Sequence, residues 1–484
     1  MLFCLELLGF SFLSAYFIWL QTSKYGIGLS PDSTTYLRWS EAISKEGFSF
    51  VLKNKYATFP PLYPVVLAIF SSFFHVDPML IARWFNILLS FCFTFLSIFL
   101  CRKLTKSLVI LFVFGLFVSF SRPLNLVFSH AWSEPLFIFF LLLIAFFVGG
   151  TGLKHLILMG FFSALAILTR YAGVAVVPIV CLYIFISKYE ISAKVKRCFC
   201  YALLPTLTYI TYLIRNYYFT KTLMGPRTAS NTGLISNCDR AFSTVALWFS
   251  GSFYFSAILL FFVFGAFVWN YRKELFKFGV GAPGVVKFSF CFVLVYSAFI
   301  IVTSTTTAYD LINDRLMAPV FLFALLLLFS LVVFICKTSI IEKSLLYLLC
   351  SVLIVCTVIS FAKALTKDIN FRKNHGVEGY NSELWQENNL VKYLRANKLN
   401  LHEKIFTNDI YSFFIIDKKI KTLSIPLQRG GEITNLEDSV VVYFFNNNQS
   451  GAFTLNELQT ICEMRSVVKN MDGGIFKVAK CAKP

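Results

Sequence analysis

Long apolar stretches alternate with short polar ones along the first three quarters of the chain. A helix needs about 20 mostly apolar residues to cross a bilayer, and runs near that length recur up to about residue 362. Placing one span on each run predicts about eleven transmembrane helices. They cover residues 2–20, 81–101, 107–121, 133–149, 155–169, 172–187, 198–214, 243–269, 287–303, 316–335 and 344–362. The pattern predicts a polytopic α-helical membrane protein.

The loops between these spans indicate the orientation. Lys and Arg collect in the cytoplasmic loops of membrane proteins. With the N-terminus in the cytoplasm, every short loop on that side is basic: Arg102 to Lys106, Lys154, Lys188 to Arg197, Arg272 to Lys277, and Lys337 to Lys343. Residues 21–80 and 363–484 then lie outside. The loop over 21–80 also carries basic residues, but long loops follow the tendency poorly, so the short loops decide.

The first outer loop, 21–80, contains two predicted helices. "SPDSTTYLRW" (Ser30 to Trp39) fits a short helix that starts near Pro31 or Asp32. "FPPLYPVVLAIFSSFF" (Phe59 to Phe74) is apolar, but it is short and its prolines fit the opening turn of a helix. This second segment predicts a re-entrant or interfacial helix lying against the bundle.

The tail changes character at about Lys363, which predicts a membrane domain over 1–362 and a small soluble α/β domain over 363–484. "SELWQENNLVKYLRANKL" is typical of an amphipathic helix, and "KIFTNDIYSFFII" of a strand, a turn and a helix. "SVVVYFF" fits a buried strand, and "GGIFKVAK" suits an edge strand. Cys462 and Cys481 can pair if this domain faces an oxidising compartment.

Composition agrees with this assignment and narrows the partners. Only 14% of the residues are charged, against about 25% in soluble domains, and the mean hydropathy is +0.71. The net charge of +19 resides mostly in the short loops, where it sets topology, so we expect no nucleic-acid partner. "MLFCLELLGFSFLSAYFIWLQ" lacks a basic start, which favours a retained first span over a cleaved signal.

Two carboxylates are the first candidates for chemistry at the outer face. Asp32 lies in the first outer loop, and Glu134 in "SHAWSEPLF" lies at the outer end of the fourth span. Both have structural alternatives, because Asp32 fits a helix cap and Glu134 before Pro135 fits a helix start that complements the macrodipole. Two carboxylates that reach one outward cavity would suit general acid–base catalysis or divalent-metal binding.

Arginines form the second set of candidates. Arg170 lies between two nearly continuous spans and could instead extend to the interface. Arg215 and Arg227 follow the seventh span, and Arg315 precedes the tenth, where it could also pair with Asp310 or Asp314. Guanidinium groups bind phosphate well because they stay charged and offer a planar fork of donors. A sugar on a polyprenyl phosphate would place its tail in lipid and its phosphate near these arginines.

The motifs "PDSTTYL", "FPPLYP", "SEPLF", "LTRYAGVAVVP" and "DRLMAPVFLF" together resemble the GT-C superfamily of integral-membrane glycosyltransferases, in particular its family-39-like and aminoarabinose-transferase-like bacterial members. The resemblance covers about residues 1–335. It implies a GT-C-like bundle of about eleven transmembrane helices with a small C-terminal α/β domain. It also implies a multi-pass protein of the bacterial inner (plasma) membrane, with the active site and C-terminal domain outside.

The resemblance further implies a reaction. The acidic residue of the first outer loop is the family's general base and matches Asp32, which would deprotonate an acceptor hydroxyl or amine. A hexosyl or pentosyl group would pass with inversion from polyprenyl phosphate to a glycan, lipid or protein acceptor. Glu134 matches an acidic position that in relatives helps to bind the acceptor or a divalent metal, and no other cofactor is implied. The candidate substrate-binding residues are Arg170, Tyr171, Arg215, Arg227, Arg315 and Tyr63.

Two positions depart from the family pattern. Ser33 follows Asp32 where relatives often have a second acidic residue, which argues against protein O-mannosylation and favours a lone base. Phe59 stands where many relatives have a histidine before the two prolines, so no histidine role carries over.

A transporter or flippase of a lipid-linked or anionic substrate is the main alternative function. Transporters usually show internal repeats and broken helices at the membrane midplane. This sequence shows no convincing repeat, and its candidate charges gather at one face. A polymerase or ligase that uses lipid-diphosphate sugars would share the outward-facing site. The sequence therefore favours the glycosyltransferase.

Overall fold

The computed structural model describes residues 2–53, 57–150, 152–249, 282–308, 310–337, 362–363, 365–397, 403–418, 420–426, 433–445 and 453–482. The chain divides into two compact units. The first unit comprises Met1–Gln21 and Tyr36–Phe371, and the second comprises Thr22–Thr35 and Arg372–Pro484. The start of the first outer loop thus packs with the C-terminal residues, which the sequence analysis did not predict.

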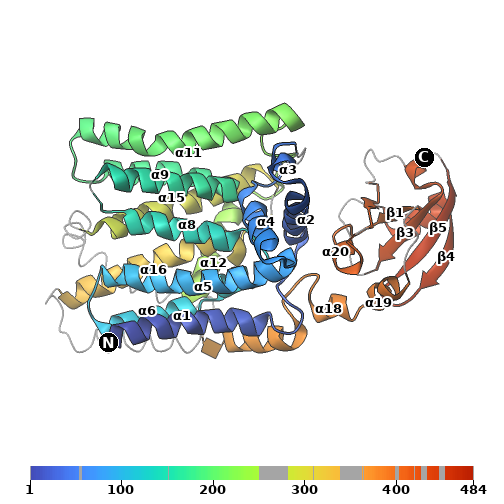
Figure 1. Cartoon of the computed structure of the whole chain (residues 1–484), viewed down its shortest axis with the longest axis horizontal. Helices are drawn as coiled ribbons and strands as arrows, with labels where there is room; N and C mark the ends of the chain where they lie inside the picture. Colours follow the sequence, from blue (N-terminus) through green and yellow to red (C-terminus); the bar gives the residue numbers. More distant parts are fainter. Residues whose placement is uncertain are drawn as a thin grey trace. The chain divides into compact units, whose positions relative to one another are not determined.

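The first unit is a bundle in which the long helices run side by side (Figure 1). Its helices are α1 (Leu2–Gln21), α5 (Pro78–Arg102), α6 (Leu108–Ser119), α7 (Arg122–Phe128), α8 (Glu134–Phe147), α9 (Leu153–Thr169), η1 (Tyr171–Ala175), α10 (Val176–Phe185), α11 (Ile191–Thr220), α12 (Leu234–Phe249), α15 (Gly284–Thr306) and α16 (Asp314–Lys337).

Five of the described helices are long and apolar enough to cross a membrane: α1, α5, α11, α15 and the Asp314–Phe334 part of α16. The pair α6 and α7 makes a sixth if it is one span bent by 49°. The bend has a local cause, because Ser121 caps a new helix start with Pro123 in its first turn. Helices α8, α9 and η1–α10 are apolar but shorter. The predicted number of eleven spans is not confirmed, and the predicted spans 243–269 and 344–362 lie mostly outside the described residues.

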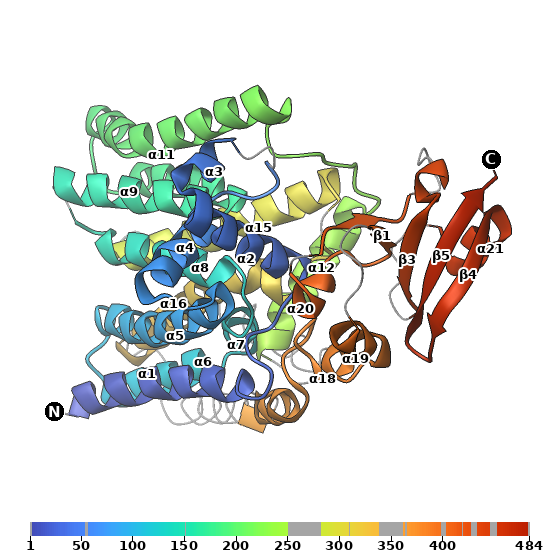
Figure 2. The same ribbon diagram turned by 45° about the vertical axis from the view of Figure 1, so that its right-hand side comes forward.

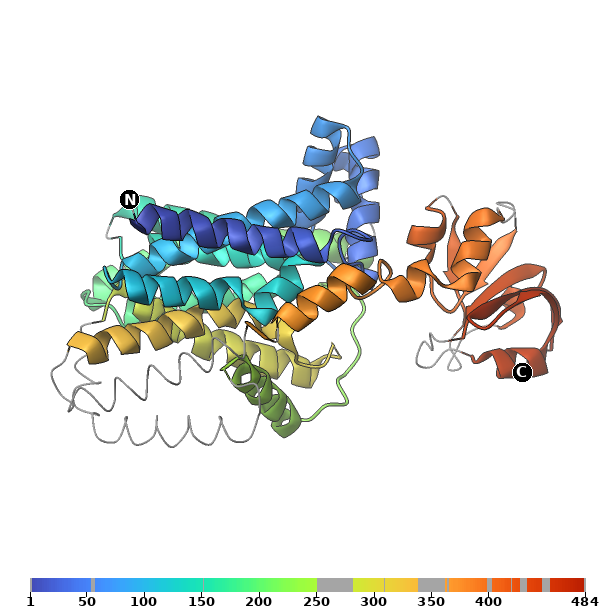
Figure 3. The same cartoon turned by 90° about the horizontal axis from the view of Figure 1, so that it is seen from below.

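Short helices gather at one end of this bundle (Figure 3). They are α2 (Pro31–Glu46), whose larger part belongs to the first unit, α3 (Phe48–Lys53) and α4 (Leu62–Phe74). The helix predicted after the prolines is confirmed as α4, and it ends at His75 in a left-handed conformation with φ 56°. Its re-entrant or interfacial placement stays a prediction.

A buried polar contact fixes the chain between α7 and α8. The Asn86 amide on α5 donates to the carbonyl oxygens of Phe128 (3.0 Å) and His130 (2.7 Å). Buried backbone carbonyls need such partners, because leaving one unpaired costs about 1–3 kcal/mol. Asn86 therefore anchors the turn that leads into the start of α8.

The second unit is a five-stranded sheet with helices on both faces (Figure 2). The strand order is β2 (Thr422–Ser424), β1 (Lys404–Thr407), β3 (Ser439–Phe444), β5 (Gly473–Cys481), β4 (Cys462–Lys469). Strand β1 is parallel to β2 and β3, whereas β5 is antiparallel to β3 and β4. The helices are α18 (Glu383–Gln386), α19 (Asn389–Ala396), α20 (Phe413–Ile416), η2 (Ile433–Leu436) and α21 (Leu455–Ile461).

Successive side chains of β3 point to opposite faces of the sheet, so they contribute to both hydrophobic cores of this unit. Val441 and Tyr443 pack with η2 and α21 on one face, while Val440 and Val442 pack with α19 and α20 on the other. The predicted buried strand is thereby confirmed. The prediction of an edge strand at "GGIFKVAK" is wrong, because β4 pairs with the far side of β5. The predicted single amphipathic helix is two helices, since Asn388 caps a new start at α19.

Residues 22–35 join this unit through specific contacts. Leu29 forms an isolated parallel β-bridge with Gly379, and the Asn381 amide donates to the carbonyl oxygen of Ile27 (2.8 Å). Gly379 has φ +94°, and a Cβ there would overlap the Leu29 carbonyl. Only glycine tolerates both conditions, because L side chains rarely adopt this conformation.

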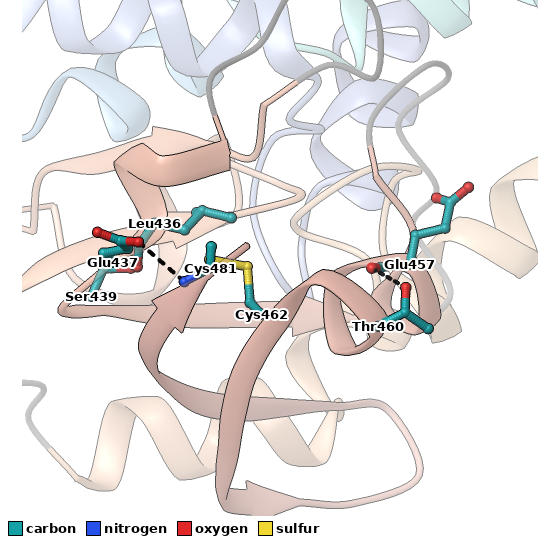
Figure 4. Close-up of a disulfide and its surroundings, with 7 residues drawn as sticks. All are labelled: Leu436, Glu437, Ser439, Glu457, Thr460, Cys462 and Cys481. Carbon is teal, nitrogen blue, oxygen red and sulfur yellow. Dashed lines mark hydrogen bonds between the residues drawn. A yellow bond between two sulfur atoms is a disulfide. The ribbon is translucent and has the colours of Figure 1, made fainter. Parts of the chain in front are cut away.

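A disulfide joins Cys462 at the start of β4 to Cys481 at the end of β5 (Figure 4). The Cys481 N–H also donates to the Glu437 carboxylate at 3.2 Å. The structure thus contains the pair considered in the sequence analysis.

Candidate functional site

A buried carboxylate bound by two arginines lies in the first unit. Glu134 is the first residue of α8 and is 1% exposed. Its Oε1 accepts from Arg170 Nη1 at 2.7 Å and from Arg315 Nε at 2.5 Å. The structure therefore brings together three of the predicted site residues from three separate segments. We call Glu134, Arg170 and Arg315 the Arg–Glu–Arg cluster.

The start of α8 positions the carboxylate. Pro135 occupies the first turn, where its missing N–H costs nothing, so the chain can begin a helix at Glu134. The preceding Ser133 accepts from Arg170 Nη1 at 3.1 Å and bonds the Tyr36 hydroxyl at 3.2 Å. Tyr36 lies on α2, so this serine links the cluster to the helix of the first outer loop.

Arg315 is held on two further sides. Its guanidinium lies 4.2 Å from the centre of the Trp132 ring, which stacks on His130 at 4.0 Å. Its Nη1 also bonds Asp310 Oδ2 at 3.4 Å, so the predicted alternative pairing occurs together with the Glu134 contact. An arginine stacked on an aromatic face keeps its planar fork oriented. Its orientation is therefore fixed before any ligand arrives.

The cluster retains unused polar groups. Within the described part of the chain, Glu134 Oε2 and the fully buried Tyr63 hydroxyl have no hydrogen-bond partner. Arg170 donates to Ser133 and Glu134 through Nη1, and within the described residues its Nε and Nη2 donors remain for another group. Buried unpaired polar atoms are rare and costly, and they are often explained by a water or ligand. Two arginines share one buried carboxylate, and the second acid that pairs with Arg315, Asp310, has a side chain that is 68% exposed, so the interior of the cluster carries a positive excess that favours an anion.

Three further predicted substrate residues contact the backbone of the first outer loop at residues 51 and 57–58. Arg215 donates to the Val51 carbonyl at 2.6 Å, and the Tyr171 hydroxyl donates to the Ala57 carbonyl at 2.6 Å. Arg227 donates to the Thr58 carbonyl at 3.4 Å. These side chains hold the loop against α11 and η1, and the structure does not place them in the Arg–Glu–Arg cluster.

An apolar groove of about 480 Å³ opens beside Arg215. Leucine and valine side chains of α3, α4, α9 and α11 line it, among them Leu52, Val65 and Leu207. Helix α11 is largely unburied: only 11% of the residues in its most apolar 18-residue stretch are buried against the rest of the protein. The groove therefore presents an apolar wall with one guanidinium beside it.

Asp32 belongs to the second unit, in the first turn of α2. Tyr36, which bonds Ser133, follows it by four residues on the same helix. No group of three His, Cys, Asp or Glu side chains suited to a metal ion is present among the described residues. The two cationic partners of Glu134 also do not fit a divalent cation at that carboxylate.

Comparison with known proteins supports the fold. No sequence family and no curated protein matches the chain. Among solved structures, the chain is similar to ArnT from Cupriavidus metallidurans bound to undecaprenyl phosphate, at 12% identity and a TM-score of 0.59, over 97% of this chain and 98% of ArnT. It is also similar to the Archaeoglobus fulgidus oligosaccharyltransferase in complex with Zn and sulfate, at 9% identity and a TM-score of 0.53, over 98% of this chain and 73% of that one.

These similarities confirm the expected fold, namely a bundle of apolar helices with a small C-terminal sheet domain. Sequence reasoning missed Ser133, Tyr36 and Trp132 as parts of the cluster. The segment "AWSEP" contains Trp132 and Ser133 directly before Glu134. A serine and an aromatic ring beside a buried acid can contact the same arginines as the acid, so these two residues could have been predicted.

Proposed function

We propose that this chain is an inverting glycosyltransferase that moves a sugar from a polyprenyl-phosphate donor to an acceptor at the outer face of a bacterial inner membrane. The Arg–Glu–Arg cluster carries this proposal, because it combines excess positive charge with unpaired buried polar groups at the start of an apolar helix. ArnT, which has the same fold, was solved with undecaprenyl phosphate.

The arginines suit the phosphate of the donor. Arg170 has donors available, and Arg315 is oriented by Trp132 and Glu134. Charge-assisted hydrogen bonds from a guanidinium fork match phosphate oxygens. Glu134 acts in this account as a positioning residue that holds both guanidiniums. The apolar groove beside Arg215 offers the isoprenoid tail a surface continuous with the lipid-facing side of α11.

The reaction needs one proton transfer and one displacement. The Asp32 carboxylate takes the proton of the acceptor hydroxyl, whose oxygen attacks the anomeric carbon of the donor sugar. The bond from that carbon to the phosphate oxygen breaks on the opposite face, so the configuration inverts. The polyprenyl phosphate leaves with one additional negative charge, which the arginines stabilise most in the transition state.

The outer location rests on two observations. The short loops at the end of the bundle opposite to the first outer loop are basic, which favours the cytoplasm for that end. Disulfides persist in oxidising compartments and are rare in the cytoplasm, so the Cys462–Cys481 bond favours a C-terminal domain outside the cytoplasm.

A transfer assay tests the proposal. Purified protein is incubated with radiolabelled polyprenyl-phosphate hexoses and pentoses and an extract of envelope glycans, lipids and proteins. Wild type and Arg122→Lys should transfer label, since Arg122 makes only partly exposed ion pairs. Arg170→Lys should lose about 100-fold in rate, because lysine cannot reproduce the fork. Equal rates for Arg170→Lys and Arg122→Lys would contradict the phosphate role. Movement of the intact donor across proteoliposomes without transfer would support the transporter instead.

A further inference from the structure

The second unit contains a cavity of about 310 Å³ that the proposed donor site does not use. Residues 29–31 and 379–388 line it, together with Phe444 at the end of β3 and Asp472 in the turn between β4 and β5. All of them belong to one compact unit. Its volume lies at the small end of the range for ligand pockets, roughly 300–1,000 Å³, which suits one or two sugar rings better than a large ligand.

An aromatic ring forms one wall of this cavity. Trp385 is partly exposed, and its ring centre lies 5.0 Å from that of Tyr380 and 5.3 Å from that of Phe444. Tyr380 is itself fixed, since its hydroxyl donates to Asp409 Oδ1 at 2.9 Å. Burial and the nearby Asp409 raise the pKa of Tyr380, so it stays a neutral donor. The Trp385 ring is thus held rigidly, as a face that packs on the C–H side of a sugar must be.

Polar groups surround the ring. Asp472 uses Oδ2 to accept two bonds from Asn389, at 2.7 and 2.9 Å, which leaves Oδ1 for a ligand. Asn388 uses Oδ1 to cap α19 at 3.0 Å, which leaves its amide N–H groups. In the described ranges, neither these groups nor Trp385 Nε1 has a partner. A carboxylate acceptor beside amide and indole donors matches vicinal hydroxyls, each of which donates and accepts.

The cavity is also placed next to the proposed base. Ser30 and Pro31 line it, and Asp32 is the next residue of the chain. We propose that this cavity is a carbohydrate-binding site that holds the sugar end of the acceptor, so that the acceptor is a glycan or glycolipid. The assignment to the acceptor rests on the proposed function, whereas carbohydrate binding itself does not.

Saturation-transfer NMR on the full chain in nanodiscs tests the site. The probes are glucose, galactose, mannose, arabinose, N-acetylglucosamine, lactose and maltose. At least one should receive saturation from the wild type. Trp385→Ala and Asp472→Asn should each weaken its binding about tenfold or more. Trp385→Phe keeps an aromatic face but lacks the indole N–H, so it should bind more tightly than Trp385→Ala, which separates loss of the ring from misfolding. Trp84→Ala and Glu463→Gln, both at exposed positions elsewhere, should bind as the wild type does.

Two results would overturn the site: no probe binds the wild type, or binding persists unchanged in Trp385→Ala and Asp472→Asn. Failure of the proposed function is distinguishable. If a sugar binds in this way but no polyprenyl-phosphate donor is consumed, the cavity stands and the glycosyltransferase does not. If sugar is transferred while both variants keep the wild-type KM for the acceptor, the assignment of the cavity to the acceptor fails and the glycosyltransferase stands.

Discussion

Neutralising Glu134 removes the charge that holds the buried Arg315 and the mostly buried Arg170 together. In Glu134→Gln the side chain keeps its shape and one accepting oxygen, but Arg170 and Arg315 then face each other with only the exposed Asp310 as a counter-charge. At an effective dielectric of about 20, the gross attraction across 2.7 Å is about 6 kcal/mol for each arginine. Desolvation offsets much of this attraction, and removing one partner of a buried pair costs about 3–5 kcal/mol. We expect a loss near 3 kcal/mol, because the amide still accepts a bond.

Reversible denaturant unfolding in detergent micelles measures this loss. Asp310→Asn is the matched control, because Asp310 bonds the same Arg315 but its side chain is 68% exposed. Exposed pairs contribute about 0–1 kcal/mol, so the control should change the free energy of unfolding little. Raised salt should reduce only the effect of the control. A loss below about 1 kcal/mol in Glu134→Gln, or equal losses in both variants, would refute the view of Glu134 as the buried centre of the cluster.

Three other predictions concern the second unit. Replacing Cys462 and Cys481 together by serine should lower its free energy of unfolding by about 3 kcal/mol, because the bond closes a loop of 19 residues. Denaturant unfolding of the variant and of the wild type, with and without reductant, measures this loss. A formed disulfide would be contradicted if neither the substitution nor the reductant changed the stability. The pKa of Glu383 is lowered mainly by its bond to His375, so its stabilising contribution is present above pH 4.5 and is lost as the pH falls through the lowered value. Thermal unfolding of Glu383→Gln should therefore differ from wild type at neutral pH and converge with it in acid, and a constant difference would count against the bond. Gly379→Ala should cost roughly 1–3 kcal/mol by denaturant unfolding, because its φ is +94°; an unchanged midpoint would contradict the described turn.

The sequence predicted the helical class well because membrane-length apolar runs and basic loops follow from the bilayer itself. It also predicted the β3 strand, whose residues are buried on both faces. It did not reveal that β5 is covered by β4, because "CEMRSVVK" alternates weakly and the pairing depends on a hairpin closed by long-range contacts. Strand position within a sheet is a tertiary property that local patterns do not record.

The candidate site was predicted in part. Glu134, Arg170 and Arg315 are candidates on sequence alone because charges near membrane depth are expensive, and the structure brings them together. Their pairing through one carboxylate oxygen depends on the relative positions of three helix ends, which spacing along the chain does not fix. Arg215 gives the same signal in the sequence, yet its guanidinium bonds the backbone of the first outer loop.

The most direct test of the central claim is acceptor-dependent release of polyprenyl phosphate from a purified polyprenyl-phosphate-sugar donor, with wild type beside Asp32→Asn. The wild type should release polyprenyl phosphate only when acceptor is present, with inversion at the anomeric carbon. Asp32→Asn, while folded and still able to bind donor, should release polyprenyl phosphate at least about 100-fold more slowly, as expected for loss of a general base. Release by folded Asp32→Asn at the wild-type rate would contradict the role of Asp32 as the base.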